Sequence, residues 1–203
     1  MLRAGRQPIH VGSPTRASRA RPRRPRRLSK HQKLVLVPGY SVLVIDTNIL
    51  LSSLPMVASL VESMQWTILI PLAVITELDG ISSNSNQLGE AAKEAIAYIT
   101  SHIRSHALSL RVQTSKGNYL RTLTVRSEQV EFVSDSWERN MDDLILRAAV
   151  WQDDHWVDRS AILGVGKQNT TGASKVVLLT FDRNCECFYP YVINILLTMS
   201  QCV

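Results

Sequence analysis

Short apolar runs alternate along this chain with segments in which apolar residues recur every three or four positions. Residues 41–45, 66–70 and 175–180 are almost uninterrupted apolar runs, which favours strands covered on both faces, as in a parallel sheet. Residues 108–113 alternate between apolar and polar positions, which is typical of a half-buried strand. The pattern therefore predicts four strands.

Helical spacing predicts the intervening elements, which we place at 49–64, 71–80, 90–106 and 140–151. Pro71 suits the first turn of a helix, because the nitrogen at that position needs no donor. Asn140 is a predicted N-cap, which would place Asp142 and Asp143 in the first helical turn. Strands that alternate with helices indicate one α/β domain around a mostly parallel sheet.

Charge divides the chain unevenly. Residues 1–33 contain eleven Lys or Arg and no acid, so that removing them from the total of 23 leaves twelve basic against 17 acidic residues. We divide the chain into a disordered basic arm (1–33), a folded domain (34–184) and an atypical tail (185–203). The arm is open to four interpretations: a solvated tail, a segment that attracts RNA phosphates, a nuclear import signal, or a mitochondrial presequence.

The three cysteines all lie in the last nineteen positions, which is too few and too clustered for a disulfide scaffold and favours a reducing compartment. We therefore expect a cytoplasmic or nuclear protein, with the mitochondrial alternative left open by the arm. No apolar run reaches the roughly 20 residues of a membrane span, so no membrane partner is expected.

Four acidic residues lie where apolar segments meet polar turns. Asp46 and Asp182 directly follow predicted strands, and ligands of parallel sheets bind at the carboxyl ends of strands. Glu77 and Asp142 lie on helices that can reach the same edge. Each acid alone has an ordinary explanation as a surface or helix-capping group. Four clustered carboxylates would instead repel one another unless a cation neutralised them, and hard oxygen ligands select Mg²⁺ or Mn²⁺.

Four segments, taken together and in order, resemble the motifs of a PIN domain: IDTN at 45–48, PLAVITELDG at 71–80, NMDDLIL at 140–146 and LLTFDRN at 178–184. More narrowly they resemble the telomerase-associated ever-shorter-telomeres group, which includes the endonuclease of nonsense-mediated mRNA decay. The resemblance implies a three-layer, Rossmann-like fold with helices on both sides of the sheet. It also implies partners among mRNA decay or telomerase-associated proteins.

The resemblance implies an endonuclease of single-stranded RNA that depends on Mg²⁺ or Mn²⁺. By that pattern Asp46, Asp142 and Asp182 are metal ligands and Glu77 is a fourth catalytic acid. Residues expected to orient these carboxylates by hydrogen bonding are Asn48, Asp143 and Thr180. Basic residues that are candidates for contact with RNA phosphates are Lys116, Arg121, Arg126 and Arg183.

Two other functions remain open from the sequence. The first is a catalytically inactive RNA-binding or scaffold protein of the same fold, because residues 185–203 depart from the family pattern and suggest a truncated gene product. The tail would then pack as a substitute strand or expose an apolar surface. The second is a phosphatase with an aspartyl nucleophile, which is disfavoured because Asn48 stands where that chemistry usually has a second aspartate.

Overall fold

The structure is a computed structural model that describes residues 35–124, 137–181 and 192–194, with side chains described outside 137–140 and 192–194. The elements run in the order β1 (Val42–Ile45), α1 (Thr47–Glu62), β2 (Thr67–Pro71), α2 (Leu72–Ser82), α3 (Gln87–His102), β3 (Leu110–Gln113), β4 (Tyr119–Leu120), α4 (Trp137–Asp154), β5 (Val176–Thr180) and β6 (Val192–Asn194).

One sheet joins all the described strands, in the order β4-β3-β2-β1-β5-β6. Strand β1 is central and pairs in parallel with β2 and with β5, so that Val44 lies opposite Leu69 on one side and Leu178 on the other. Strand β4 is antiparallel to β3, and the other pairings are parallel. The carboxyl ends of β1, β2, β3 and β5 therefore share one edge.

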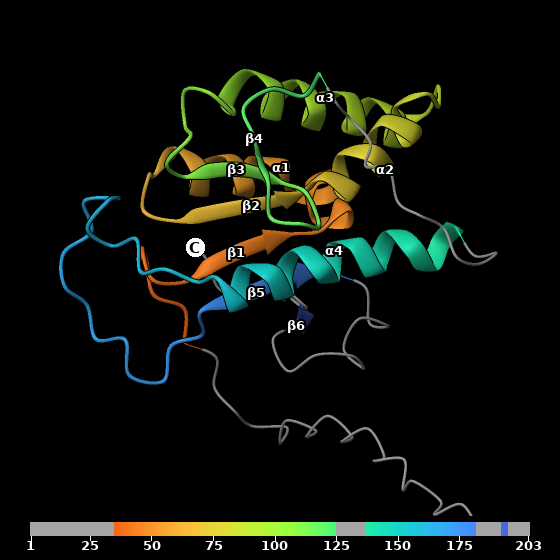
Figure 1. The fold of residues 1–203 in the computed structure, drawn as a ribbon. Helices are drawn as coiled ribbons and strands as arrows, with labels where there is room; N and C mark the ends of the chain where they lie inside the picture. Colours follow the sequence, from red (N-terminus) through yellow and green to blue (C-terminus); the bar gives the residue numbers. More distant parts are fainter. Residues whose placement is uncertain (1–34, 125–136, 182–191, 195–203) are drawn as a thin grey trace, which may run out of the picture.

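Strands β1, β2 and β5 are buried at every position because helices cover both faces of the sheet. Helix α4 crosses in front of β1 and β5 in Figure 1, and α1 lies behind the sheet. This explains why the three strands are uninterrupted apolar runs, since neither face meets water. The expected α/β, three-layer fold with a mostly parallel sheet is confirmed. Within the described residues, no helix is both long and apolar enough to cross a bilayer.

Helix α4 begins at Trp137, three residues before the predicted N-cap at Asn140. The N-cap prediction was wrong because Glu138 and Arg139 are good helix formers, and they extend the helix toward the N-terminus. Asp142 and Asp143 consequently lie in the second turn of α4. Pro71 is the last residue of β2 and the residue before α2, rather than a member of the helix.

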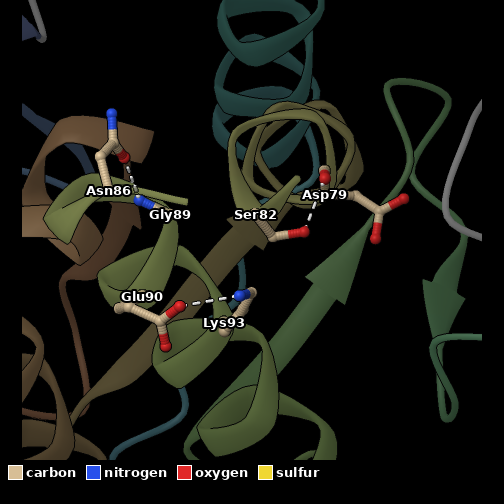
Figure 2. A network of polar contacts seen from close by, with 6 residues as sticks. All are labelled: Asp79, Ser82, Asn86, Gly89, Glu90 and Lys93. Atoms are coloured by element: carbon tan, nitrogen blue, oxygen red, sulfur yellow. Dashed lines mark hydrogen bonds and ion pairs between the residues drawn. The ribbon is translucent and has the colours of Figure 1, made fainter. Parts of the chain in front are cut away.

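The connection between α2 and α3 is shorter than the interval between the helices predicted at 71–80 and 90–106, and local hydrogen bonds lie at both of its ends (Figure 2). The Asn86 side chain caps α3 by accepting from the Gly89 N–H at 2.9 Å. The Ser82 hydroxyl donates to the Asp79 carbonyl at 2.7 Å, and Lys93 pairs with Glu90 at 2.8 Å. The Ser82 bond lies at the end of α2, which carries Glu77, and the other two contacts lie at the start of α3.

Strand β6 lies in the tail, residues 185–203, for which the sequence allows either a substitute strand or an exposed apolar surface. Residues Val192–Asn194 pair in parallel with β5, with Leu178 opposite Val192 and Thr180 opposite Asn194. The sheet therefore extends into the region beyond residue 184.

Candidate active site

Asp46 lies at the junction of β1 and α1 and is 9 % exposed. Its backbone is extended (φ −87°, ψ 161°), which ends the strand, and its side chain caps the helix that follows. The carboxylate oxygen Oδ1 accepts from the Thr47 N–H at 2.7 Å. The N-terminus of α1 also favours a negative charge at this point, because unpaired backbone N–H groups face it.

Asn48 and Thr180 hold the other oxygen of the same carboxylate. Asn48 Nδ2 donates to Asp46 Oδ2 at 2.9 Å and to Thr180 Oγ1 at 3.1 Å. The Thr180 hydroxyl in turn donates to Asp46 Oδ2. Asn48 Oδ1 accepts from the Phe181 N–H at 3.0 Å, which ties the start of α1 to the end of β5. The Asp46 carboxylate is therefore held by groups from the start of α1 and the end of β5.

Glu77 reaches this edge from α2, where it is half-buried. The Thr47 hydroxyl donates to Glu77 Oε2, which joins the start of α1 to α2. Burial raises the pKa of the Glu77 carboxyl above its ordinary value of 4.5, the neighbouring Asp46 and Asp142 carboxylates raise that pKa further, and the Thr47 hydrogen bond lowers it. Three of the four predicted acids therefore act on one another at one edge of the sheet.

Asp142 and Asp143 are both exposed on α4. Asp142 is the one whose charge reaches Glu77. Asp143 instead lines a separate hollow together with Ser115 and Arg147. The two neighbouring acids thus lie toward different parts of the surface.

The structure describes only some of the remaining predicted site residues. Asp182, Arg183 and Arg126 lie outside the described residues. Lys116 is exposed in the turn between β3 and β4, and Arg121 is exposed after β4. The structure does not bring these two basic residues into contact with Asp46.

Sequence reasoning did not single out Thr47, although its hydroxyl links Glu77 to the start of α1. The only signal in the sequence is its position, directly after Asp46. A hydroxyl there meets α2 only because β1 and β2 are neighbours in the sheet, and strand order is not written in any local motif.

The chemistry of the donor set suits a hard divalent cation. Asp46, Glu77 and Asp142 offer carboxylate oxygens, which are the ligands that Mg²⁺ and Mn²⁺ prefer. Burial is the main cause of the raised pKa of Glu77, and the negative charges of Asp46 and Asp142 add to it; a cation at this edge would offset those charges. Within the described ranges, no three acidic, histidine or cysteine side chains are grouped closely enough to hold one ion.

Comparison with known proteins identifies the class of protein to which this fold and this group of acidic residues belong. The sequence profile of the PIN domain matches residues 43–187. The chain belongs to the PIN domain family.

Among curated proteins, the chain is similar to telomerase-binding protein EST1A of Danio rerio, with 29 % identity over 157 residues. The match covers 70 % of this chain and 10 % of that protein, so the chain spans about a tenth of the length of this relative. Among solved structures, it is similar to the PIN domain of human SMG5, with 28 % identity and a TM-score of 0.31. That match covers 36 % of this chain and 60 % of the solved chain.

Proposed function

We propose that this protein is an endonuclease that hydrolyses phosphodiester bonds of single-stranded RNA with the help of Mg²⁺ or Mn²⁺. The observation that carries the proposal is the position of the Asp46 carboxylate, which Asn48 and Thr180 hold by hydrogen bonds at the carboxyl end of β1. This is the edge of a parallel sheet where ligands bind, and Glu77 of α2 accepts from the neighbouring Thr47 hydroxyl. Membership of the PIN domain family supports the same reading.

Asp46 and Asp142 would hold the divalent ion, together with the predicted ligand Asp182. A bound ion of this kind makes water more acidic and offsets negative charge on the phosphate. Asn48 and Thr180 fix the direction of the Asp46 carboxylate through their hydrogen bonds to Oδ2. Glu77 is suited to accept the proton of the attacking water, because its raised pKa makes its carboxylate a stronger base.

The biological setting that we propose is nonsense-mediated mRNA decay or related RNA surveillance. The similarity to a telomerase-binding protein supports partners among telomerase-associated or mRNA decay proteins. The same setting would place the protein in the cytoplasm, the nucleus or both. Co-purification of a tagged full chain with such proteins, compared between the two compartments, tests this part of the proposal.

The catalytic part is tested with a fluorescently labelled, unstructured RNA in the presence of Mg²⁺ or Mn²⁺. Asp46→Asn and Asp142→Asn should each lower the cleavage rate more than about 100-fold, since even changes around metal ligands cost about 10- to 100-fold. Glu94→Gln is the matched control, because Glu94 is an exposed acid on α3 outside the site. Cleavage that persists unchanged in an Asp46→Asn, Asp142→Asn double variant would overturn the proposal. RNA binding without any cleavage by the unaltered chain would favour the scaffold alternative.

A further inference from the structure

A hollow on the surface of α4 has no part in the mechanism above. It has a volume of about 460 Å³ and lies between one side of α4 and the turn that joins β3 to β4. This volume is within the range of pockets that hold small organic ligands, about 300–1,000 Å³. One of its lining residues is Asp143, the immediate neighbour of Asp142. The hollow, called the α4 hollow below, therefore begins one residue away from the proposed metal ligand.

The apolar wall of the α4 hollow is formed by Leu146, Val150 and Trp151. The Trp151 ring packs against two other rings. It stacks on the His155 ring with centroids 4.0 Å apart and planes 8° apart, and the edge-on Tyr119 ring lies 6.4 Å away. His155 Nδ1 is also bound to the Trp151 carbonyl at 2.8 Å. The wall is thus built before any ligand arrives.

The turn between β3 and β4 is pressed against the same ring. Gly117 has a φ of +87°, and a Cβ atom at this position would lie 2.0 Å from the Trp151 ring. Only glycine fits there, both because of the backbone conformation and because of the contact. The close approach places Ser115 on the rim of the hollow and the exposed Lys116 beside it.

The polar groups of the α4 hollow are arranged for a ligand that has an anion, a flat apolar part and hydrogen-bond donors. Arg147 is exposed and makes no ion pair with another residue in the described ranges. Asp143 and Asp154 lie about three helical turns apart on α4 and offer acceptors only. A nucleotide matches this set, because its phosphate is an anion and its base and ribose carry donors.

We propose that the α4 hollow holds one nucleotide of the single-stranded RNA next to the cleavage site. Arg147 contacts the phosphate, the base packs on the wall of Leu146, Val150 and Trp151, and Asp143 accepts a hydrogen bond from the ribose 2′-hydroxyl. This inference rests on the proposed function, since it takes the same RNA strand as the ligand. A nucleotide bound in the α4 hollow would fix the position of the RNA relative to the candidate acids. The contact with the 2′-hydroxyl would select RNA over DNA.

The test measures binding apart from cleavage. Fluorescence anisotropy of a labelled, unstructured oligoribonucleotide is followed at several salt concentrations in the Asp46→Asn chain. Adding Arg147→Ala should raise Kd about tenfold, as expected for a hydrogen bond to a charged group. It should also lower the slope of log K against log salt by about 0.7, the value for one phosphate contact on a single strand. Arg147→Lys, which keeps the charge, should restore most of the slope.

Lys167→Ala is the matched control, because Lys167 is an exposed cation on the loop before β5 and does not line the hollow. If Arg147→Ala changes Kd and salt slope no more than Lys167→Ala, the hollow is not part of the RNA path. If cleavage requires Asp46 but RNA binding does not depend on Arg147, the proposed nucleotide site in the hollow is wrong and the nuclease proposal still holds. If RNA binding requires Arg147 but the unaltered chain does not cleave RNA, the nucleotide site in the hollow is supported and the nuclease proposal is wrong.

The role of Asp143 is tested with the same oligonucleotide made of DNA. The Asp46→Asn chain should bind the RNA several-fold more tightly than the DNA, and Asp143→Ala should reduce that preference. Equal binding of RNA and DNA before the Asp143 change would overturn the assignment of the 2′-hydroxyl to this carboxylate.

Discussion

Asn48 makes three hydrogen bonds that converge on the candidate site, one each to Asp46, Thr180 and Phe181. Its amide is both a donor and an acceptor, and the arrangement uses both functions. An aspartate at this position would keep the acceptor but lose the donor. The side-chain amide is therefore specifically required, which is a physical reason why a second carboxylate next to Asp46 does not fit this chain.

Asn48→Asp is accordingly expected to lower the free energy of unfolding at neutral pH by about 1–3 kcal/mol, because it removes the Asn48 donor from its bonds to Asp46 and Thr180 and adds a like charge. The loss should become smaller as the pH falls and the added carboxyl takes up a proton. Urea unfolding at two pH values measures both effects. Glu94→Gln serves as the control, and a loss that does not depend on pH would contradict the explanation from charge.

Glu77→Gln is expected to raise stability at neutral pH, because burial and the nearby Asp46 and Asp142 penalise the ionised carboxylate. The folded pKa of Glu77 lies above the ordinary value of 4.5, so the penalty is absent below that value and appears as the pH rises through the folded pKa. Glutamine can still accept from the Thr47 hydroxyl. Thermal unfolding across pH should show the two proteins converging in acid, whereas equal stability at neutral pH would contradict the prediction.

At the scale of elements, two of the contacts that organise the site depend on how helices lie against turns. Helix α2 brings Glu77 to Thr47, and α4 presents Asp142 on one side and Trp151 on another. The apolar runs and helical spacings predicted β1, β2, β3, β5 and all four helices. They did not predict β4, whose two residues are too few to show a period.

The part of the site that could be predicted is the part next to strand ends. Asp46 follows an apolar strand, and that position alone indicates an edge of the sheet. The α4 hollow could not be predicted, because Arg147 and Trp151 matter only once α4 is known to lie against the β3–β4 turn. Helical spacing indicates which face of α4 is apolar but not what the other face meets.

Gly117→Ala should destabilise the protein by more than about 1–2 kcal/mol and move the β3–β4 turn away from α4, because the new Cβ would collide with Trp151 and the φ of +87° disfavours alanine. Gly80→Ala is the matched control. It lies inside α2 with nothing within 4 Å of the added Cβ, so it should stabilise by about 0.5–1 kcal/mol. Chemical denaturation measures both, and near-equal effects would mean that the contact with Trp151 is not important.

At the scale of the whole molecule, the divalent ion can be detected without any RNA. If Asp46 and Asp142 bind Mn²⁺ in the folded state alone, the ion should stabilise the chain by about 2.7 kcal/mol at a concentration one hundred times its Kd. The Tm should therefore rise with Mn²⁺ in the unaltered chain and rise much less in Asp46→Asn. A shift of the same size in both proteins would place the ion elsewhere.

The uneven charge of the chain leads to a second prediction at this scale. Removal of residues 1–33 takes away eleven positive charges and leaves a body with a net charge of −5. If the arm attracts RNA phosphates, the shortened chain should bind unstructured RNA more weakly and with a smaller salt slope, while the cleavage rate at saturating RNA stays the same. Anisotropy at several salt concentrations tests this, and an unchanged slope would leave the arm as a solvated tail or a targeting segment.

The central place of β1 also bears on when the site can form during synthesis. Strand β1 is among the first described elements to leave the ribosome, yet its neighbour β5 is made about 130 residues later. Until β5 pairs with β1, the Thr180 hydroxyl is not beside Asp46, although the partners Thr47, Asn48 and Glu77 are already made. Contacts between residues so distant in sequence form slowly. A chain released before residue 180 would therefore carry most of the candidate acids with the Asp46 carboxylate incompletely held.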